Sequence, residues 1–226
     1  MKIAVYSRDG GAMREERLSR MLERLGKESF DLYGIGGGGD ILPGTDLVMS
    51  VGGDGTFLSA SQCVGKSGIP ILGVNLGRLG FLSEYSPEEA GEALLSGGWY
   101  LEDRELLDTK VSGDVPDNGQ RFWPYTLNEV SVHRSGAALL GIDVTIDGHP
   151  LPTYWADGLL VATSSGSTAY SLSVGGPICA PEAKVLIIAP IAPHNLNARP
   201  LVVPDTTRIT VSMRSRDDGV MLSMDN

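Results

Sequence analysis

The stretch LVMSVGGDGTFLSASQCV, residues 47–64, decides how the first half of the chain folds. Its first five residues form a short apolar run with the β-branched content of a buried parallel strand. Gly52, Gly53 and Gly55 surround Asp54, and glycines let a backbone turn sharply or come close to a ligand. The residues that follow favour a helix. In an open α/β sheet, such a loop lies at the carboxyl end of a strand, where ligands bind.

The alternation of strand and helix continues on both sides of this stretch. Residues 2–6 and 69–74 predict two more strands. Between residues 2–6 and 47–51, apolar residues recur at the spacing of an amphipathic helix that packs on a sheet, at Leu18, Met21, Leu22 and Leu25. After residue 74, Ser86, Pro87 and Glu89 form a capping box with proline at the first helical position, and this helix should end near Gly97 and Gly98.

From Trp99 onward, strand signals replace helical periodicity. Residues 142–146 alternate, and Asp147-Gly148 supplies a hairpin turn. Further strands are predicted at 159–164, 184–190, 200–204 and 208–213. We therefore predict two domains: residues 1–98, a Rossmann-like α/β domain with a parallel sheet, and residues 99–226, a β-rich, β-sandwich-like domain.

The charge balance limits the partners. The chain of 226 residues has 28 acidic and 18 basic residues, a net charge of −10, which disfavours nucleic-acid binding because such binding needs a concentrated basic face. Glycine-rich backbone amides can still hold a small anion. The first residues lack the pattern of a signal peptide, and no apolar run approaches the ~18 residues of a membrane span. We expect a cytoplasmic protein without a membrane partner.

Other candidate motifs predict no site. Cys63 and Cys179 stand alone, so buried, inert thiols are expected rather than a disulfide or metal pair. Gly34, Gly36 and Gly39 match GxGxxG by count, but a loop-like segment with Pro43 follows where a dinucleotide fingerprint needs a helix. We expect a flexible surface loop there, and the run Gly36–Gly39 is the one low-complexity tract of the sequence. GxxxxGK[ST] and GxSxG are both absent.

Asp54 offers the charged side chain of the glycine-rich loop. Gly52, Gly53, Gly55 and Thr56 can present backbone amides to phosphate oxygens. A carboxylate repels phosphate, so Asp54 is better suited to orient or deprotonate a hydroxyl that attacks phosphorus, or to hold Mg²⁺. The alternative is a tight turn in which Asp54 caps the next helix.

Four further segments indicate a family. GGDGT is shared by NAD kinases, by diacylglycerol and sphingosine kinases and, more loosely, by phosphofructokinases. The segments NLGRLGFLSE (75–84), LNEVSVHR (127–134), ADGLLVATSSGSTAYSLSVGGPI (156–178) and APIAPHNLNARPLVVP (189–204) occur in the order of the NAD kinase blocks. The chain therefore resembles NAD kinases over nearly its whole length. Lipid kinases usually carry a GTGND-like loop where this chain has residues 75–80.

The resemblance implies transfer of the terminal phosphate of ATP, or of another nucleoside triphosphate or inorganic polyphosphate, to the 2′-hydroxyl of the adenosine ribose of NAD, with Mg²⁺. Asp54 matches the family's general base or hydroxyl-orienting aspartate. Asn128 and Glu129 match the pair that binds the adenosine part of NAD. Because neighbouring residues on a regular strand face opposite sides, both can reach one ligand only at a strand end or bulge. A solvated Glu129 and a turn at Asn128 are the alternative.

The resemblance also implies that NAD lies in a cleft between Asp54 and residues 157–173. Asp157 matches a contact on the nicotinamide side, and Tyr170 matches a residue that could stack on adenine, although it could instead be a buried structural tyrosine. The other matched NAD contacts are Gly55, Phe81, Ser165, Thr168, Ala169, Ser173 and Ala192.

The phosphate contact, the C-terminal segment and the assembly complete the set of expectations. Arg78, Arg134 and Arg199 are all candidates for the phosphate contact. Family members normally continue beyond the position of Asn226, so we expect a C-terminal segment to be truncated or missing, and its contribution cannot be assigned. The resemblance implies a homodimer or homotetramer. A GGDGT-type lipid kinase and a catalytically silent NAD-binding protein are the competing functions.

Overall fold

The computed structural model describes residues 1–8, 14–36, 39–113, 123–216 and 219–225. It forms two compact units, Met1–Glu102 and Asp103–Asn226, each of which is described by itself. The predicted placement of the domain boundary between residues 98 and 99 stays a prediction.

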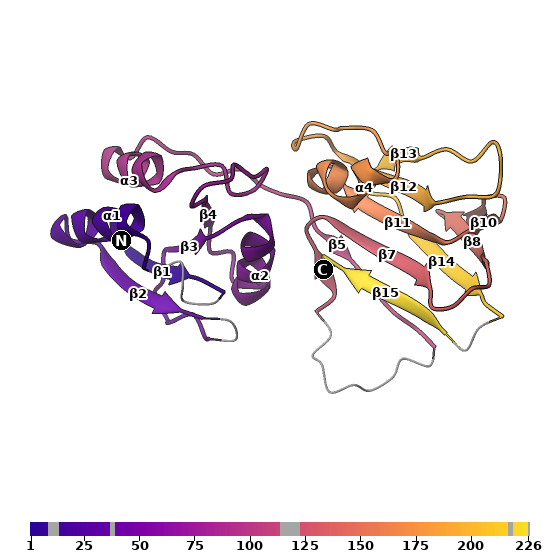
Figure 1. Ribbon diagram of the computed structural model, residues 1–226, viewed down its shortest axis with the longest axis horizontal. Coiled ribbons are helices and arrows are strands. Elements are labelled where there is room, and N and C mark those ends of the chain that lie inside the picture. Colours follow the sequence, from indigo (N-terminus) through magenta and orange to yellow (C-terminus); the bar gives the residue numbers. More distant parts are fainter. Residues whose placement is uncertain (9–13, 37–38, 114–122, 217–218, 226) are drawn as a thin grey trace. The chain divides into compact units, whose positions relative to one another are not determined.

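The first unit is a parallel sheet with helices on both faces (Figure 1). Its strands are β1 (Lys2–Tyr6), β2 (Asp31–Ile35), β3 (Leu47–Val51) and β4 (Ile71–Val74). Its helices are α1 (Glu16–Lys27), α2 (Asp54–Val64) and α3 (Pro87–Ser96). The strand order is β2-β1-β3-β4, and all three pairings are parallel. The predicted α/β fold with a parallel sheet is confirmed.

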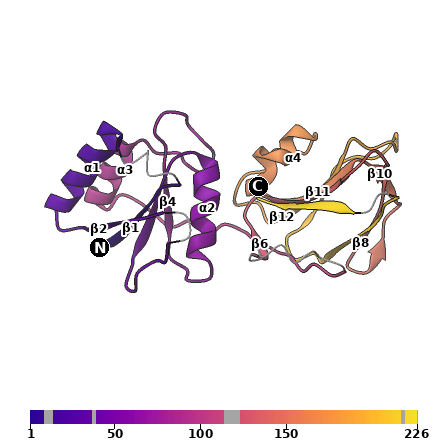
Figure 2. The same cartoon turned by 60° about the horizontal axis from the view of Figure 1, so that its bottom comes forward.

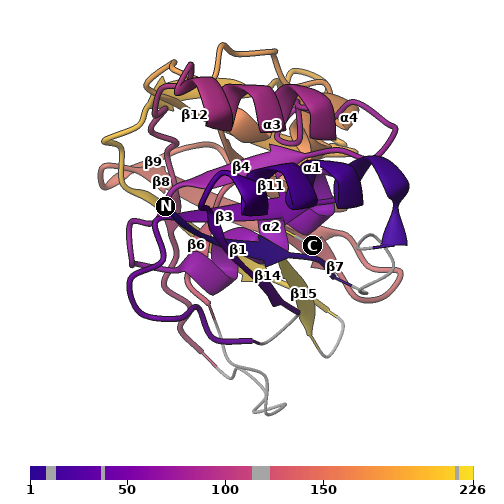
Figure 3. The same cartoon turned by 90° about the vertical axis from the view of Figure 1, so that its left-hand side faces the viewer.

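Two apolar clusters hold the layers of this unit together. Helices α1 and α3 lie side by side on one face of the sheet (Figure 3), where Leu18, Leu25 and Leu94 pack against the strands. Helix α2 covers the other face with Ala60 and Val64. Every residue of β3 is buried, as expected of a strand covered on both faces.

Sequence signals at the ends of α3 are confirmed. The Ser86 side chain accepts the N–H of Glu89, and the Glu89 carboxylate accepts the N–H of Ser86, which completes the predicted capping box. Gly97 ends the helix in the left-handed conformation (φ 68°).

The glycine-rich segment after Asp31 was only partly predicted. Gly34 was expected in a surface loop, but it lies in β2 and pairs with Val5 of β1. Because a glycine contributes no side chain to a strand pattern, the β2 signal was weak. In the tract Gly36–Gly39, residues 37 and 38 lie outside the described part of the chain.

The second unit contains two antiparallel sheets. One has the order β10-β8-β14, with β9 paired to β8, and the other has the order β13-β12-β11-β7-β15. The strands are β7 (Glu129–Arg134), β8 (Leu140–Ile146), β9 (His149–Pro150), β10 (Tyr154–Ala156), β11 (Gly158–Thr163), β12 (Val185–Ile191), β13 (Leu201–Pro204), β14 (Ile209–Arg214) and β15 (Val220–Met224). β5 (Leu107–Asp108) and β6 (Tyr125–Thr126) pair with each other as a short antiparallel two-stranded sheet.

The two large sheets enclose a common core, and this confirms the β-rich, sandwich-like prediction (Figure 2). Ile142, Val144, Leu159 and Ile188 are buried in it. The 3-10 helix η2 (Ser165–Thr168) and the short helix α4 (Tyr170–Ser173) follow β11 directly. Tyr170 packs against a second cluster, which lies on the other face of the five-stranded sheet and consists of Leu160, Ala162, Ile187 and Ala189.

Candidate functional site

The strand order of the first unit creates a switch point between β1 and β3. The chain leaves β1 toward β2 on one side and leaves β3 toward β4 on the other. Open α/β sheets bind ligands outside the carboxyl ends of the strands at such a point. Ser7 and Arg8 follow β1 there, and residues 52–56 follow β3.

The loop of residues 52–56 needs its first glycine. Gly52 has φ 148°, and a Cβ on it would lie 2.4 Å from the Thr56 hydroxyl oxygen. Gly53 is the N-cap of α2, and open space lies where its Cβ would be. The first N–H groups of a helix have no acceptor within the helix and carry a partial positive charge. The loop therefore suits phosphate oxygens, and the assignment of Gly52, Gly53, Gly55 and Thr56 to them stays a prediction.

Two buried hydroxyls lie at the same strand ends. Ser7 is 5% exposed and Ser50, next to the last residue of β3, is 0% exposed. Neither side-chain oxygen has a hydrogen-bond partner within the described residues. An unpaired buried hydroxyl costs about 1–3 kcal/mol.

Arg8 was missed by sequence reasoning. Its guanidinium donates to the Gly55 carbonyl at 3.0 Å and to the Ser59 hydroxyl at 2.6 Å, so a cation is held against the first turn of α2. Its place directly after a strand at the switch point was the signal that could have identified it. The three arginines considered from the sequence lie elsewhere.

Asp54 is the first residue of α2, and its carboxylate binds the backbone of another loop. Oδ2 accepts the N–H of Phe81 at 2.9 Å, and Oδ1 accepts the N–H groups of Leu82 and Ser83 at 3.0 Å each. A carboxylate has about four acceptor positions, so about one remains for a ligand hydroxyl. The aspartate thus does more than cap its own helix: it orders residues 81–83.

The loop that Asp54 orders is also anchored at its base. Buried Asn75 donates its N–H to the Tyr85 carbonyl and its side-chain amide to the Ser83 carbonyl. A Cβ on Gly80 would lie 2.1 Å from Asp54 Oδ1, so this glycine allows the close approach. Phe81, whose N–H binds the carboxylate, is 62% exposed.

In the second unit, Asn128 and Glu129 lie where the pair can act together. Glu129 is the first residue of β7 and Asn128 precedes it, so the pair is at a strand end, as its joint action requires. The Asn128 carbonyl accepts the N–H of Thr163 at 2.9 Å. A Cβ on Gly166 would lie 2.1 Å from the same oxygen, which shows how closely η2 approaches the pair.

The predicted residues of η2 and α4 gather around this strand end. Ser165 is 9% exposed and accepts a long hydrogen bond (3.4 Å) from Arg104. The Tyr170 main-chain N–H lies near enough to the Glu129 carboxyl to lower its pKa, so these two residues are brought together. The Tyr170 ring is half-buried and stacks on His133, with ring centroids 5.7 Å apart and 17° between the planes. Thr168 and Ala169 are half-buried and Ser173 is exposed.

Asp157 and Ala192 lie at neighbouring strand ends. Asp157 precedes β11 and forms an ion pair with Arg134, in which Nε lies 2.8 Å from Oδ1. This pairing commits Arg134 to a carboxylate rather than leaving it available for phosphate. Ala192 follows β12 and has φ 46°, and non-glycine residues in this strained region cluster at functional sites. The functional roles of Asp157 and Ala192 stay predictions.

Burial raises the pKa of the Glu129 carboxyl well above its ordinary value. Desolvation, with a smaller contribution from the nearby Asp225 carboxylate, raises the pKa of Glu129 to about 7, although the Tyr170 N–H opposes the shift. Its Oε2 atom is buried and has no hydrogen-bond partner within the described residues. Near neutral pH this carboxyl therefore exchanges between a neutral and an ionised form, which suits a group that contacts a polar ligand.

The remaining candidates are two arginines considered for the phosphate contact and the two cysteines. Arg78 is exposed on the loop after β4. Arg199 donates to the Leu196 and Ala198 carbonyls of its own loop at 3.1 and 2.7 Å. Cys63 and Cys179 are both free, as predicted, but they are partly exposed rather than buried.

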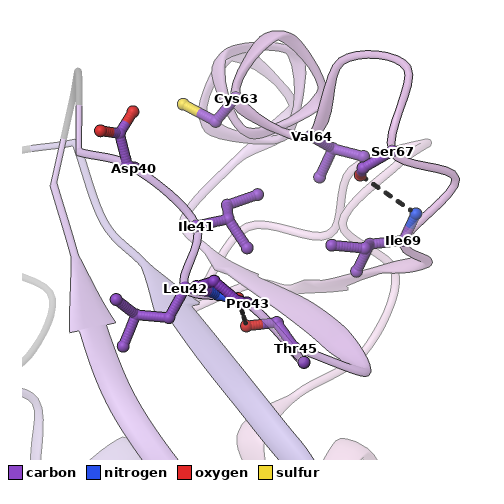
Figure 4. A pocket seen from close by; sticks show the side chains of 10 residues that line it. Asp40, Ile41, Leu42, Pro43, Thr45, Cys63, Val64, Ser67 and Ile69 are labelled. Atoms are coloured by element: carbon purple, nitrogen blue, oxygen red, sulfur yellow. Dashed lines mark hydrogen bonds between the residues drawn. The ribbon is translucent and has the colours of Figure 1, made fainter.

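One pocket of the first unit is separate from these residues. It has a volume of about 410 Å³ and lies between residues 40–45 and the end of α2 (Figure 4). Its polar groups bind one another: the Thr45 hydroxyl donates to the Leu42 carbonyl, and the Ile69 N–H donates to the Ser67 hydroxyl. It contains none of the predicted site residues and offers a ligand few free polar groups.

Within the described ranges, no group of three or more His, Cys, Asp and Glu side chains is arranged to hold a metal ion. None of the helices described is long and apolar enough to cross a membrane.

Two family models and several curated proteins match the chain. The family of the ATP-NAD kinase N-terminal domain matches residues 41–96, and the family of the ATP-NAD kinase C-terminal domain matches residues 127–226. The NAD kinase of Bacteroides fragilis is 46% identical over 184 residues, which are 80% of this chain and 62% of that protein. The NAD kinase of Flavobacterium psychrophilum is 43% identical over 185 residues, with the same coverage. The chain thus spans 62% of the length of these curated relatives.

Solved structures resemble the chain over its full length. An NAD kinase from Archaeoglobus fulgidus in complex with ATP is 30% identical, with a TM-score of 0.72, and the match covers 99% of this chain and 90% of that one. Yeast NADH kinase in complex with NADH is 26% identical, with a TM-score of 0.75, and the match covers 100% of this chain and 75% of that one.

Proposed function

The chain belongs to the NAD kinase family, and from this premise we propose that it transfers the terminal phosphate of ATP to the 2′-hydroxyl of the adenosine ribose of NAD, giving NADP. The observation that carries the proposal is Asp54. Its carboxylate lies in a glycine-rich loop at the switch point, is held by three backbone N–H groups and keeps about one acceptor position free.

The donor phosphates bind to the first unit. The amides of residues 52–56 and the N-terminus of α2 receive the phosphate oxygens. Arg8, held by Gly55 and Ser59, contributes positive charge beside them. Phosphoryl transfer needs positioning and charge stabilisation rather than covalent chemistry from the protein, and these groups supply both.

The acceptor nucleotide binds to residues of the second unit, and Phe81 is carried over from the family as a further contact. Asn128 and Glu129 hold the ribose hydroxyls and the adenine edge, because an amide and a carboxylate together offer both donors and acceptors. Tyr170 and Asp157 contact the base and the nicotinamide side. The other contacts carried over from the family are Gly55, Ser165, Thr168, Ala169, Ser173 and Ala192.

Asp54 orients the attacking hydroxyl and accepts its proton as the bond to phosphorus forms. The phosphorus–oxygen bond to ADP breaks, and the electron pair leaves with ADP. Since three acceptor positions are occupied by backbone N–H groups, the hydroxyl has a narrow range of directions from which to approach the carboxylate.

The family resemblance implies Mg²⁺, which would be supplied together with the phosphate donor. The described residues do not provide a cluster of acidic or imidazole groups that would hold the ion alone, and the Asp54 oxygens are largely used by backbone N–H groups. Mg²⁺ is commonly bound through substrate phosphates with few protein ligands. Bound through the phosphates of ATP, Mg²⁺ would neutralise part of their charge.

One assay separates this function from its alternatives. The protein is incubated with Mg-ATP and NAD, and NADP is detected with an NADP-specific dehydrogenase. NADP formation is expected, while faster transfer to diacylglycerol would favour the lipid kinase, and NAD binding without turnover would indicate a silent binding protein. Inorganic polyphosphate and other nucleoside triphosphates replace ATP in parallel reactions to define the donor range.

The position of phosphorylation gives a second test. 2′-Deoxy-NAD should be inert, because its remaining 3′-hydroxyl is misplaced and a misplacement of about 1 Å can cost roughly 10²-fold in rate. 3′-Deoxy-NAD keeps the 2′-hydroxyl and should retain some activity. Rapid phosphorylation of 2′-deoxy-NAD would overturn the assignment.

We further propose a cytoplasmic homodimer or homotetramer, as in the family. Light scattering during size-exclusion chromatography gives the mass of the assembly, and a monomer at working concentration would contradict the oligomeric part. Fractionation of the source cells tests the location.

A further inference from the structure

Asp225 makes an unusual set of contacts in the second unit. It follows β15, which pairs with β7 at the edge of the five-stranded sheet. Its Oδ2 accepts the N–H of Leu127 at 2.5 Å, and its Oδ1 accepts the N–H groups of Asn128 at 2.7 Å and of Glu129 at 3.1 Å. One side chain thus binds three consecutive backbone N–H groups that are 96 to 98 residues away in the sequence.

The backbone of Asp225 takes part in the same arrangement. Its N–H donates to the Glu129 carbonyl at 3.1 Å, and its φ of 56° is in the left-handed region. Aspartate visits that region more readily than most residues, but still at a cost. Asp225 is only 5% exposed. A buried carboxylate in a strained conformation needs compensation, and the three N–H groups provide it.

The carbonyls of the same segment are bound from another direction. The Thr163 hydroxyl donates to the Leu127 carbonyl at 2.5 Å, and the Thr163 N–H donates to the Asn128 carbonyl at 2.9 Å. Residues 127–129 are therefore held by Asp225 through their N–H groups and by Thr163 through two of their carbonyls. The backbone is fixed before any ligand binds, while the side chains of Asn128 and Glu129 project from it.

We propose that Asp225 is a positioning residue for the acceptor nucleotide: it holds the backbone of Leu127–Glu129 so that Asn128 and Glu129 meet the ligand in one fixed arrangement. The inference rests on the proposed function, since it assigns the acceptor to that pair. Asp225 itself acts through the backbone and does not touch the substrate.

The charge of Asp225 adds a measurable signature. Among the described residues, Asp225 from the end of β15 is the charged group that acts on Glu129, and α4 contributes the Tyr170 N–H. Desolvation and this neighbouring carboxylate raise the pKa of Glu129 to about 7. An ionised Glu129 accepts hydrogen bonds from ribose hydroxyls, so NAD affinity should fall as the pH falls through 7. Neutralising Asp225 should move that fall to lower pH.

The test compares Asp225→Asn with a matched control, Asp147→Asn. Asp147 also has a left-handed backbone (φ 49°), and its carboxylate accepts the Arg208 N–H at 2.9 Å, but it lies in the β8–β9 turn. Calorimetry measures NAD and ATP affinity between pH 5.5 and 8.5. We expect Asp225→Asn to weaken NAD binding at pH 8 by about ten- to hundredfold, to leave ATP binding unchanged and to shift the pH midpoint downward. The control should match the wild type.

Three results would overturn the inference: wild-type NAD affinity in Asp225→Asn, equal losses for NAD and ATP, or an unshifted pH midpoint. If Asp225→Asn does not fold, hydrogen exchange of the wild type decides. The amides of residues 127–129 should exchange slowly without NAD, and fast exchange that slows only with NAD would exclude a pre-positioned backbone. The exchange result does not depend on turnover. A wild type that makes no NADP would therefore refute the proposed function, and the exchange rates of the amides of residues 127–129 would still test this inference.

Discussion

Asp54 has two tasks, and a single substitution affects both. Asp54→Asn should lower turnover by about 10² to 10⁴-fold, the usual contribution of a positioned acid or base. The amide also replaces an acceptor oxygen with a donor that faces the N–H groups of residues 81–83, so the loop should loosen. Steady-state kinetics measure the first effect, and hydrogen exchange of residues 81–83 measures the second. Wild-type turnover combined with a loosened loop would leave Asp54 with a structural role alone.

The surroundings of the Tyr170 ring fit both a structural tyrosine and a residue that stacks on the base of NAD. It packs on the cluster around Leu160 and stacks on His133, as a structural tyrosine would, yet it is only half-buried and adjoins Glu129. We expect Tyr170→Ala to weaken NAD binding by about 1–3 kcal/mol, the contribution of one stacked base, and to spare ATP. Tyr170→Phe keeps the ring and should bind NAD nearly as the wild type does. Calorimetry with both nucleotides measures these effects, and unchanged NAD affinity in the alanine variant would assign Tyr170 to the core.

At the scale of elements, the loop of residues 75–85 is as important as the helix that it meets. Gly80→Ala would place a methyl group 2.1 Å from Asp54 Oδ1, so either the carboxylate or the loop must move. A displacement near 1 Å can reduce the rate by about 10²-fold, and we expect a loss of that order in kcat. Gly77→Ala is the matched control, since no atom lies within 4 Å of its Cβ position. Equal kinetics in the two variants would show that the contact does not control the reaction.

Sequence patterns predicted those elements whose signals are local. Helix α3 was predicted because Ser86, Pro87 and Glu89 form a complete cap within four residues. The role of Asp54 in ordering residues 81–83 could not be predicted, because its partners are 27 to 29 residues away. The same reason hid Asp225, whose contacts depend on the pairing of β15 with β7. Local spacing thus predicts caps and strands, whereas contacts between distant segments need the fold.

At the scale of the whole molecule, carboxyls with a raised pKa make stability depend on pH, and burial raises the pKa of Asp225 as well as those of the two glutamates. Desolvation raises the pKa of Glu129 to about 7. Desolvation and the neighbouring Asp205, which shares a hydrogen bond with it, raise the pKa of Glu105 to about 7 as well. In the unfolded chain both glutamates titrate near 4.5. Between these values the folded protein binds protons that the unfolded chain has released, so the free energy of unfolding must fall as the pH rises from about 4.5 to about 7.

Neutral substitutions at the two glutamates should each reduce this dependence of stability on pH. Glu129→Gln should raise the free energy of unfolding above pH 7 by at most about 3 kcal/mol, because a shift of one pKa unit corresponds to 1.36 kcal/mol. Glu105→Gln should have a smaller effect, since its more exposed surroundings screen the charge. Glu182→Gln, at an exposed position, is the control. Denaturant unfolding of each variant at pH 5.5 and pH 8 measures the difference. If Glu129→Gln retains the full wild-type difference between the two pH values, this carboxyl is ionised in the folded protein at pH 5.5. Such a result would also remove the reason to expect NAD affinity to change near pH 7, so this one measurement links the stability of the second unit to the acceptor site.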